Sequence, residues 1–275
     1  MVMYFITVSE MLGTNGEKIA RQVAKELNYT FYGEEELFKA ADEMGFLSDI
    51  KKLGEKSPAL LERFFGEKPK IYLDRLQSVI YEVARKGDAV FFGRGSQLLL
   101  HSFDCAFHVL VTGSMEKRVK RVMEEKQVNR EVAEKIIHRS DHDKRGFIRF
   151  AFDEDWLNPH LYDLISNTDK LSVDSVVKMI AEGARSEEIK SCGIDSVTNL
   201  KRLSIQRQIE SALLESGLMT SHLFFTIENG NSVRLFGMVN SQEEKEKVEA
   251  LAKKAKDIKR VANDLVIYKG SMSGL

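Results

Sequence analysis

The sequence is short of the residues and segments that mark several special classes of protein. Among 275 residues there are only 3 prolines and 2 cysteines, and no low-complexity tract occurs. Cys105 and Cys192 lie far apart and match no metal-site or disulfide spacing, so we expect both to be reduced. No apolar run reaches the roughly 18 residues that cross a bilayer, and no basic stretch precedes the first apolar run. We therefore expect a cytoplasmic globular protein without a transmembrane segment.

Neither sign of charge is in excess, because the 41 lysines and arginines are nearly balanced by 42 aspartates and glutamates. A net charge of -1 gives no global attraction to nucleic acid or to an acidic membrane, and we expect no nucleic-acid partner. Cations nevertheless concentrate between residues 117 and 149, where glutamates interleave with them. This region is either an anion-binding site or a solvated helix face.

Buried strands alternate with helices over the first 185 residues. Apolar runs at Tyr4–Val8, Ala89–Phe92 and Ala106–Thr112 read as buried strands, and a shorter one is expected at Tyr162–Ile165. Helical spacing follows the first run, and further helices are expected from about Ser114, from about Asn129 and after Ser172. Continuous apolar strands separated by helices indicate an α/β fold, a parallel sheet with helices on both faces.

A second domain is expected after a polar linker. The elements expected beyond the linker are a helix at Leu203–Glu215, strands at Leu223–Glu228 and Ser232–Val239, a helix at Gln242–Lys256 and a strand at Val261–Tyr268. This order predicts a small α+β domain. We place the first domain at residues 1–185, the linker at 186–199 and the second domain at 200–270.

The segment SEMLGTNGEKIAR, residues 9–21, joins the first strand to the first helix. A phosphate loop holds its ligand there, because a helix N-terminus offers unpaired N–H groups and a positive dipole end. Gly13 and Gly16 supply backbone freedom, with Thr14 and Asn15 between them. Against the usual pattern, Glu17 replaces the lysine and Lys18 the Ser/Thr. A working phosphate loop is therefore only slightly favoured over a structural strand–turn–helix.

Other basic residues favour a phosphate site. Arg94, between Gly93 and Gly95, follows a buried strand at the sheet edge where open α/β folds bind ligands. Arg118 and Arg121 share a helix face, and phosphoryl transfer needs such positive charge around the migrating group. The further candidates in this basic region are Arg139, Asp141, Lys144 and Arg149.

The ordered series ITVSEMLGTNGEKIARQVAKEL, FYGEEEL, AVFFGRGSQLLL, HVLVTGSMEKRVKRVMEEK, HRSDHDKRGFIRFAF and YDLISNTDKL resembles the cytidylate-kinase-like family of P-loop nucleoside monophosphate kinases. The resemblance spans roughly residues 3–185 and implies a helical lid, MgATP as phosphoryl donor, and CMP, dCMP or a related acceptor. It implies that Gly13, Thr14, Asn15, Gly16, Glu17 and Lys18 hold ATP, with Thr14 a candidate magnesium ligand. Gly93, Arg94 and Gly95 would bind the acceptor, and Lys18, Arg118, Arg121, Arg139, Asp141, Lys144 and Arg149 would surround the transferring group.

Two departures from that family stand out: Ser9-Glu10 replaces a usual Ser-Arg, and Lys144 replaces a usual arginine.

The C-terminal segments LSIQRQIESALLESG and VRLFGMVNSQEEKEKVEALAKKAKDIKRVANDLVIYKG resemble a BON domain, a module associated with phospholipids or other partners. Two hypotheses follow. The chain is a P-loop phosphotransferase, or it is a catalytically impaired nucleotide sensor or scaffold whose BON-like domain binds a protein or phospholipid partner.

Overall fold

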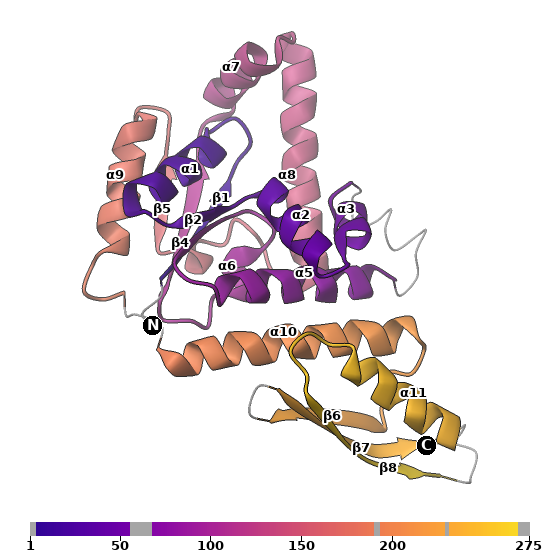
Figure 1. Ribbon diagram of the computed structural model, residues 1–275. Helices are drawn as coiled ribbons and strands as arrows, with labels where there is room; N and C mark the ends of the chain where they lie inside the picture. Colours follow the sequence, from indigo (N-terminus) through magenta and orange to yellow (C-terminus); the bar gives the residue numbers. More distant parts are fainter. Residues whose placement is uncertain (1–3, 56–67, 190–192, 229–230, 269–275) are drawn as a thin grey trace. The chain divides into compact units, whose positions relative to one another are not determined.

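A computed structural model describes residues 4–55, 68–189, 193–228 and 231–268 (Figure 1). The chain divides into two compact units. The first contains the chain up to Lys39 and from Lys86 to Ser196. The second contains Ala40–Glu55, the stretch ending at Arg85, and the chain from Val197 onward. Helix α2 (Glu34–Glu43) runs across the first boundary between them.

The first unit is built on a parallel sheet in the order β2-β3-β1-β4-β5. Its strands are β1 (Phe5–Glu10), β2 (Thr30–Tyr32), β3 (Ala89–Phe92), β4 (Ala106–Thr112) and β5 (Leu164–Asn167). Its helices are α1 (Gly16–Leu27), α6 (Ser96–Leu99), α7 (Met115–Lys126), α8 (Arg130–Phe152) and α9 (Val173–Ala184), with a 3-10 turn at Pro159–Leu161. The α/β fold class expected from the sequence is confirmed.

Helices cover both faces of this sheet, because its central strands β1 and β4 are apolar almost throughout and successive side chains point to opposite faces. Ile6, Val8 and Val109 pack against the apolar stripes of α1 and α9 in one core cluster. Leu110 faces the other side, where a second cluster contains Ile148 of α8 and the buried Trp156. A third cluster joins α7 to α8 into a helical hairpin.

Local sequence signals set many of these boundaries. The side chains of Ser114, Asn129 and Ser172 accept hydrogen bonds from the first turns of α7, α8 and α9, as the sequence predicted. The strands at 89–92 and 106–112 are also found where they were expected. The first strand extends to Glu10, two residues further than its apolar run, because Ser9 and Glu10 pair with Leu110 and Val111 of β4.

The second unit contains a three-stranded sheet in the order β6-β7-β8. Its elements are α3 (Leu47–Glu55), α5 (Lys68–Ala84), α10 (Ile194–Glu215), β6 (Leu223–Glu228), β7 (Ser232–Val239), α11 (Gln242–Lys253) and β8 (Arg260–Ile267). Apolar residues from α10, the sheet and α11 form its core cluster. The α-β-β-α-β order is the one expected. Residues 194–199, placed in the linker by the sequence, are instead the first part of α10.

Helix α5 carries polar residues that are buried and paired within this unit. Its Asp74 and Glu82 are 3% and 4% exposed. The Asp74 carboxylate accepts from Arg207 Nη1 at 3.4 Å, and Glu82 Oε1 accepts from Lys256 Nζ at 2.7 Å. Ser204 Oγ donates to the carbonyl of Ser78 at 3.0 Å. Because buried charges are stable only when paired, α5 depends on partners from the C-terminal part of the chain.

Two further expectations concern the membrane and the cysteines. Within the described ranges, no helix combines the length and the apolar character needed to span a bilayer. Cys105 lies buried just before β4 and is disulfide-bonded, so the expectation of a reduced thiol is wrong for this residue. Cys192 lies outside the described residues.

Candidate active site

The loop between β1 and α1 has the backbone of an anion-binding turn. Met11 N–H donates to the Val111 carbonyl of β4 at 2.9 Å, which fixes the start of the loop. Gly13 has a φ of 86° and Asn15 a φ of 62°, both left-handed. A Cβ on Gly13 would lie 2.8 Å from the Arg118 carbonyl oxygen, so the close approach of α7 also requires glycine there. Helix α1 then begins at Gly16 with its N-terminal N–H groups turned to the loop.

Two of the loop residues expected to contact ATP or magnesium lie in unexpected places. Thr14 is fully buried and its hydroxyl donates to the Met11 carbonyl at 2.8 Å, so it stabilises the loop from inside. Lys18 is exposed on α1 and lies with Glu17 and Arg21 along the outer surface of that helix. The exposed Glu17 pairs with Arg21 at 2.8 Å. In this conformation the loop presents backbone N–H groups rather than the side chains of Thr14 or Lys18.

Glu10 is the acidic residue closest to those N–H groups. Its Oε2 accepts from the Gly16 N–H at 2.8 Å, at the first residue of α1. A Cβ on Gly16 would clash with the Glu10 side chain, so the carboxylate occupies the space that a side chain at position 16 would need. Burial raises the pKa of the Glu10 carboxyl, while the Lys144 charge and the Gly16 N–H act in the opposite direction.

Two arginines of α7 hold the loop by its carbonyl groups. Arg118, 2% exposed, donates from Nε to the Leu12 carbonyl at 2.7 Å and from Nη2 to both carboxylate oxygens of Asp141 on α8. Arg121 donates to the Gly13 carbonyl at 3.2 Å and to Thr168. The structure therefore brings Arg118, Arg121 and Asp141 to the loop, with the guanidinium groups bound to backbone and carboxylate.

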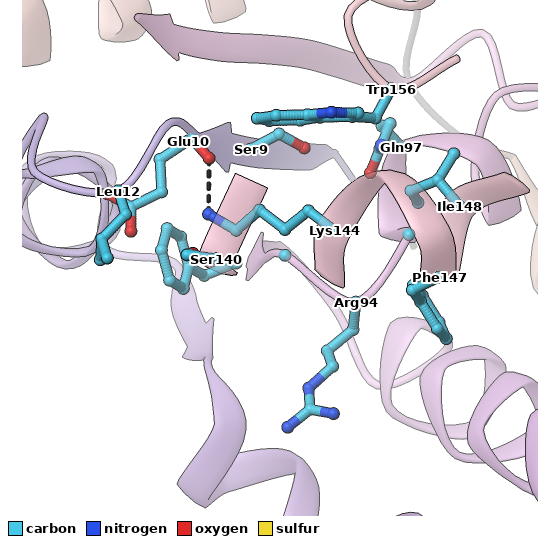
Figure 2. A pocket seen from close by; sticks show the side chains of 13 residues that line it. Ser9, Glu10, Leu12, Arg94, Gln97, Ser140, Lys144, Phe147, Ile148 and Trp156 are labelled. Carbon is cyan, nitrogen blue, oxygen red and sulfur yellow. Dashed lines mark hydrogen bonds between the residues drawn. The ribbon is translucent and has the colours of Figure 1, made fainter. Parts of the chain in front are cut away.

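A pocket of about 230 Å³ opens beside the loop (Figure 2). The residues that line it are Ser9, Glu10, Leu12, Phe92, Gly93, Arg94, Gly95, Gln97, Ser140, Lys144, Phe147, Ile148 and Trp156. It includes the end of β1 and the residues just after β3, the sheet edge at which open α/β folds bind ligands. The walls combine aromatic side chains with two cations, which suits a flat ligand that carries an anionic group.

Arg94 enters this pocket from a strained turn. Gly93, Arg94 and Gly95 all have positive φ, with 58° at the arginine. A non-glycine residue in this region costs about 1 kcal/mol or more, and such strain is concentrated at functional sites. The Arg94 guanidinium lies 5.7 Å from the Phe38 ring centre and pairs with the exposed Glu34. Binding of an anionic ligand would therefore replace the Glu34 carboxylate as the partner of Arg94.

Lys144 lies between the loop and the pocket. Its Nζ donates to the Glu10 carbonyl at 2.6 Å and lies 5.8 Å from the Trp156 ring centre. Burial lowers the pKa of the Lys144 ammonium, and the nearby charges of Glu10 and Asp141 oppose this effect. In Figure 2 the side chain runs between Trp156 and Arg94 toward Glu10.

The outer cations of α8 point into solvent. The side chains of Arg139 and Arg149 are 82% and 72% exposed, and each forms a loose pair with an aspartate four residues later, at 3.7 and 3.9 Å. The structure does not bring these two arginines to the pocket. Among the described residues, no three or more His, Cys, Asp or Glu gather into a metal-binding group.

Reasoning from the sequence missed the apolar part of the site. Trp156, Phe147 and Ile148 line the pocket, and only the spacing of Phe147 and Ile148 near Lys144 on α8 gave a usable signal. Trp156 lies beyond the helix in a turn, where no periodic pattern identifies it. Gln97 and Ser140 were missed because isolated polar residues carry no such pattern.

Comparison with known proteins agrees with this architecture. The model of the cytidylate kinase-like family matches residues 5–170, and the model of the BON domain matches residues 203–268. A protein named cytidylate kinase from Staphylothermus marinus is 26% identical over 182 residues, covering 66% of this chain and 96% of its own. A crystal structure of an uncharacterized protein from Eubacterium ventriosum shares 20% identity with a TM-score of 0.52, covering 67% of this chain and all of its own. The chain therefore belongs to the cytidylate kinase-like family and carries a BON domain after the kinase-like region.

Proposed function

We propose that the protein is a P-loop nucleoside monophosphate kinase that transfers the γ-phosphoryl group of MgATP to CMP, dCMP or a related acceptor. The observation that carries this proposal is the shared position of the anion-binding loop and the pocket at one end of the parallel sheet, with Lys144 contacting both. The similarity to a protein named cytidylate kinase supports the choice of acceptor. The reaction takes place between cytoplasmic solutes, and we propose a cytoplasmic location.

The pocket suits a nucleoside monophosphate in its chemistry. Phe92, Phe147 and Trp156 provide flat apolar walls on which a base can stack. Arg94 supplies a planar guanidinium that matches the two oxygens of a phosphate. Under this proposal the acceptor phosphate takes the place of Glu34 as the partner of Arg94.

The loop suits a phosphate, because its first helical N–H already binds an anion, the Glu10 carboxylate. Asn15, Gly16 and Glu17 would hold the phosphates of ATP by their backbone N–H groups, while Gly13 and Thr14 shape the turn. Bound MgATP would supply the γ-phosphoryl group, and Thr14 could serve as a ligand of its magnesium only if its hydroxyl leaves the Met11 carbonyl.

The remaining residues position the reactants and balance charge. Arg118 and Arg121 fix the loop carbonyls, and Asp141 fixes Arg118. Under this proposal the Lys144 ammonium, beside both the loop and the pocket, would offset the negative charge that accumulates between donor and acceptor. Arg139 and Arg149 are proposed to contribute only after a movement of the α7–α8 hairpin, as lids do in such enzymes. Lys18 lies on α1, outside that hairpin, and is proposed to contribute only if the loop itself changes conformation.

The test is release of ADP from MgATP by the purified protein against a panel of nucleoside monophosphates, with an acceptor-free control. Release that depends on acceptor and is greatest with CMP or dCMP supports the proposal. Arg94→Ala should raise the KM for the acceptor by roughly 10–100-fold, because a charge-assisted contact is lost. Arg130→Ala removes an arginine from a surface pair with Glu116, away from the pocket, and is the matched control. Folded protein that turns over no acceptor refutes the kinase proposal.

One observation favours a second candidate, a catalytically impaired nucleotide sensor or scaffold. The loop N–H that would bind a phosphate is already bound to Glu10. In this alternative the nucleotide-binding part regulates the BON domain, which binds a protein or phospholipid partner. Binding of ATP without acceptor-dependent turnover, together with a partner interaction that responds to ATP, distinguishes it from the kinase.

A further inference from the structure

Glu10 is held at both ends, at its side chain and at its backbone. Its carboxylate accepts from the Gly16 N–H at 2.8 Å, and its carbonyl accepts from Lys144 Nζ at 2.6 Å. These contacts join the end of β1 to the first residue of α1 and to the middle of α8.

The contact with Gly16 differs from ordinary helix capping. The residue at the N-cap position of α1 is Asn15, whose side chain makes no capping hydrogen bond. The cap oxygen comes instead from Glu10, six residues before Gly16, which reaches across the whole loop. The absence of a side chain at position 16 leaves room for it. Glu10 and Gly16 thus form a matched pair in which the carboxylate fills the concave side of the loop.

We propose that the Glu10 carboxylate is an internal substitute for a nucleotide phosphate, so that this residue determines how strongly the loop accepts ATP. The inference rests on the proposed function, because it assumes that the loop is the ATP site. A triphosphate and the carboxylate compete for the same N–H group and repel one another. Binding of ATP therefore requires the Glu10 side chain to rotate out of the loop.

Lys144 holds the backbone of Glu10 and not its side chain. Its ammonium donates to the Glu10 carbonyl at 2.6 Å, and Glu10 also pairs with Val111 of β4. The side chain can therefore rotate out of the loop while the end of β1 stays in place. The Lys144 ammonium remains beside the loop, where its charge would attract entering phosphates.

The test is titration of MgATP against the full chain and its Glu10→Gln and Glu10→Ala variants, by calorimetry. Glu10→Gln keeps the shape and the hydrogen bond but removes the charge, and Glu10→Ala removes both. We expect each to bind ATP about tenfold or more tightly than the parent. Glu125→Gln is the matched control, because the exposed Glu125 on α7 acts on Glu10 only through its charge, and its effect should be much smaller.

A readout without nucleotide tests the contact itself. The Gly16 amide should exchange its hydrogen at least several-fold faster in Glu10→Ala than in the parent. Equal ATP affinity in parent and variants, with acceptor-dependent turnover in the parent, overturns the inference and leaves the kinase proposal intact. An equal gain in ATP affinity in Glu125→Gln also overturns the inference, since the effect would then reflect the net charge of the protein. Absence of both ATP binding and turnover in every protein refutes the inference together with the proposed function.

Discussion

The buried carboxylate of Asp74 on α5 should make the stability of the protein fall as the pH rises. Burial raises the pKa of Asp74 to about 6, and the carboxylate of Glu210 adds to this, while Arg207 and Lys70 oppose it. One Asp74 oxygen accepts a long hydrogen bond of 3.4 Å from Arg207, and the other is buried without a hydrogen-bond partner. The charged form is therefore poorly compensated in the folded state.

The direction and the size of this pH effect follow from the linkage between protonation and folding. A carboxyl whose pKa is raised by folding stabilises the folded state when it is protonated. Its contribution to the free energy of unfolding is therefore complete below pH 3.8 and is lost as the pH rises through about 6. The difference between these two pKa values corresponds to a loss of up to about 3 kcal/mol. Asp74→Asn cannot ionise and should therefore be more stable than the parent at pH 8 by about 1–3 kcal/mol, with little difference near pH 4.

Urea unfolding followed by circular dichroism at pH 4, 5, 6, 7 and 8 measures this difference. Asp49→Asn is the matched control. Asp49 pairs with Arg75, which lies on α5 next to Asp74, so replacing Asp49 removes a favourable contact with the same helix. It should be less stable than the parent at neutral pH. The reasoning is refuted if Asp74→Asn shows the same pH dependence as the parent, or if it is less stable at pH 8.

Three further predictions concern the site and the domains. Lys144→Met should lower kcat by roughly 10²–10³ with a smaller change in KM, measured by steady-state ADP release; an unchanged kcat excludes a role in transition-state charge. Arg118→Ala should cost about 3–5 kcal/mol in the free energy of unfolding, because it leaves Asp141 unpaired and the loop unheld; a loss below about 1 kcal/mol contradicts this. A chain ending at Ala184 should be poorly folded, with a broad thermal transition, because it lacks the partners of α5; a sharp transition at the parent's Tm would refute this dependence.

The parts of the fold that could be predicted from the sequence are those fixed by local chemistry. Strands β3 and β4 carry continuous apolar runs because both faces of a parallel sheet are covered, and runs of this kind are distinctive. Ser114 and Asn129 begin helices because their side chains accept from the first turn. Short elements such as β2 and α6 were not foreseen, because three or four residues carry too little periodicity.

The position of the candidate loop could be predicted from the sequence, and its side-chain contacts could not. A strand, a glycine turn and a helix identify the loop, and the resemblance to a kinase family adds the pocket arginine. No pattern in the sequence shows that Thr14 points inward, or that Arg118 binds the Leu12 carbonyl. Such contacts depend on how α7 packs against the loop, a long-range arrangement that local spacing does not encode. Glu10 stood out only as a departure from the family, and its contact with Gly16 gives that departure a physical meaning.

The domain boundary illustrates the same distinction at a larger scale. The sequence divides at the polar stretch before Leu200, because the composition and the pattern of apolar residues change there. The compact units divide elsewhere, because Ala40–Glu55 and α5 belong with the C-terminal part. Helix α5 illustrates this, because its buried Glu82 accepts from Lys256 Nζ at 2.7 Å and its Ser78 carbonyl accepts from Ser204 of α10 at 3.0 Å. The composition of the sequence marks a linker, whereas the contacts of buried polar groups, Glu82 with Lys256 and Ser78 with Ser204, connect α5 to the C-terminal part.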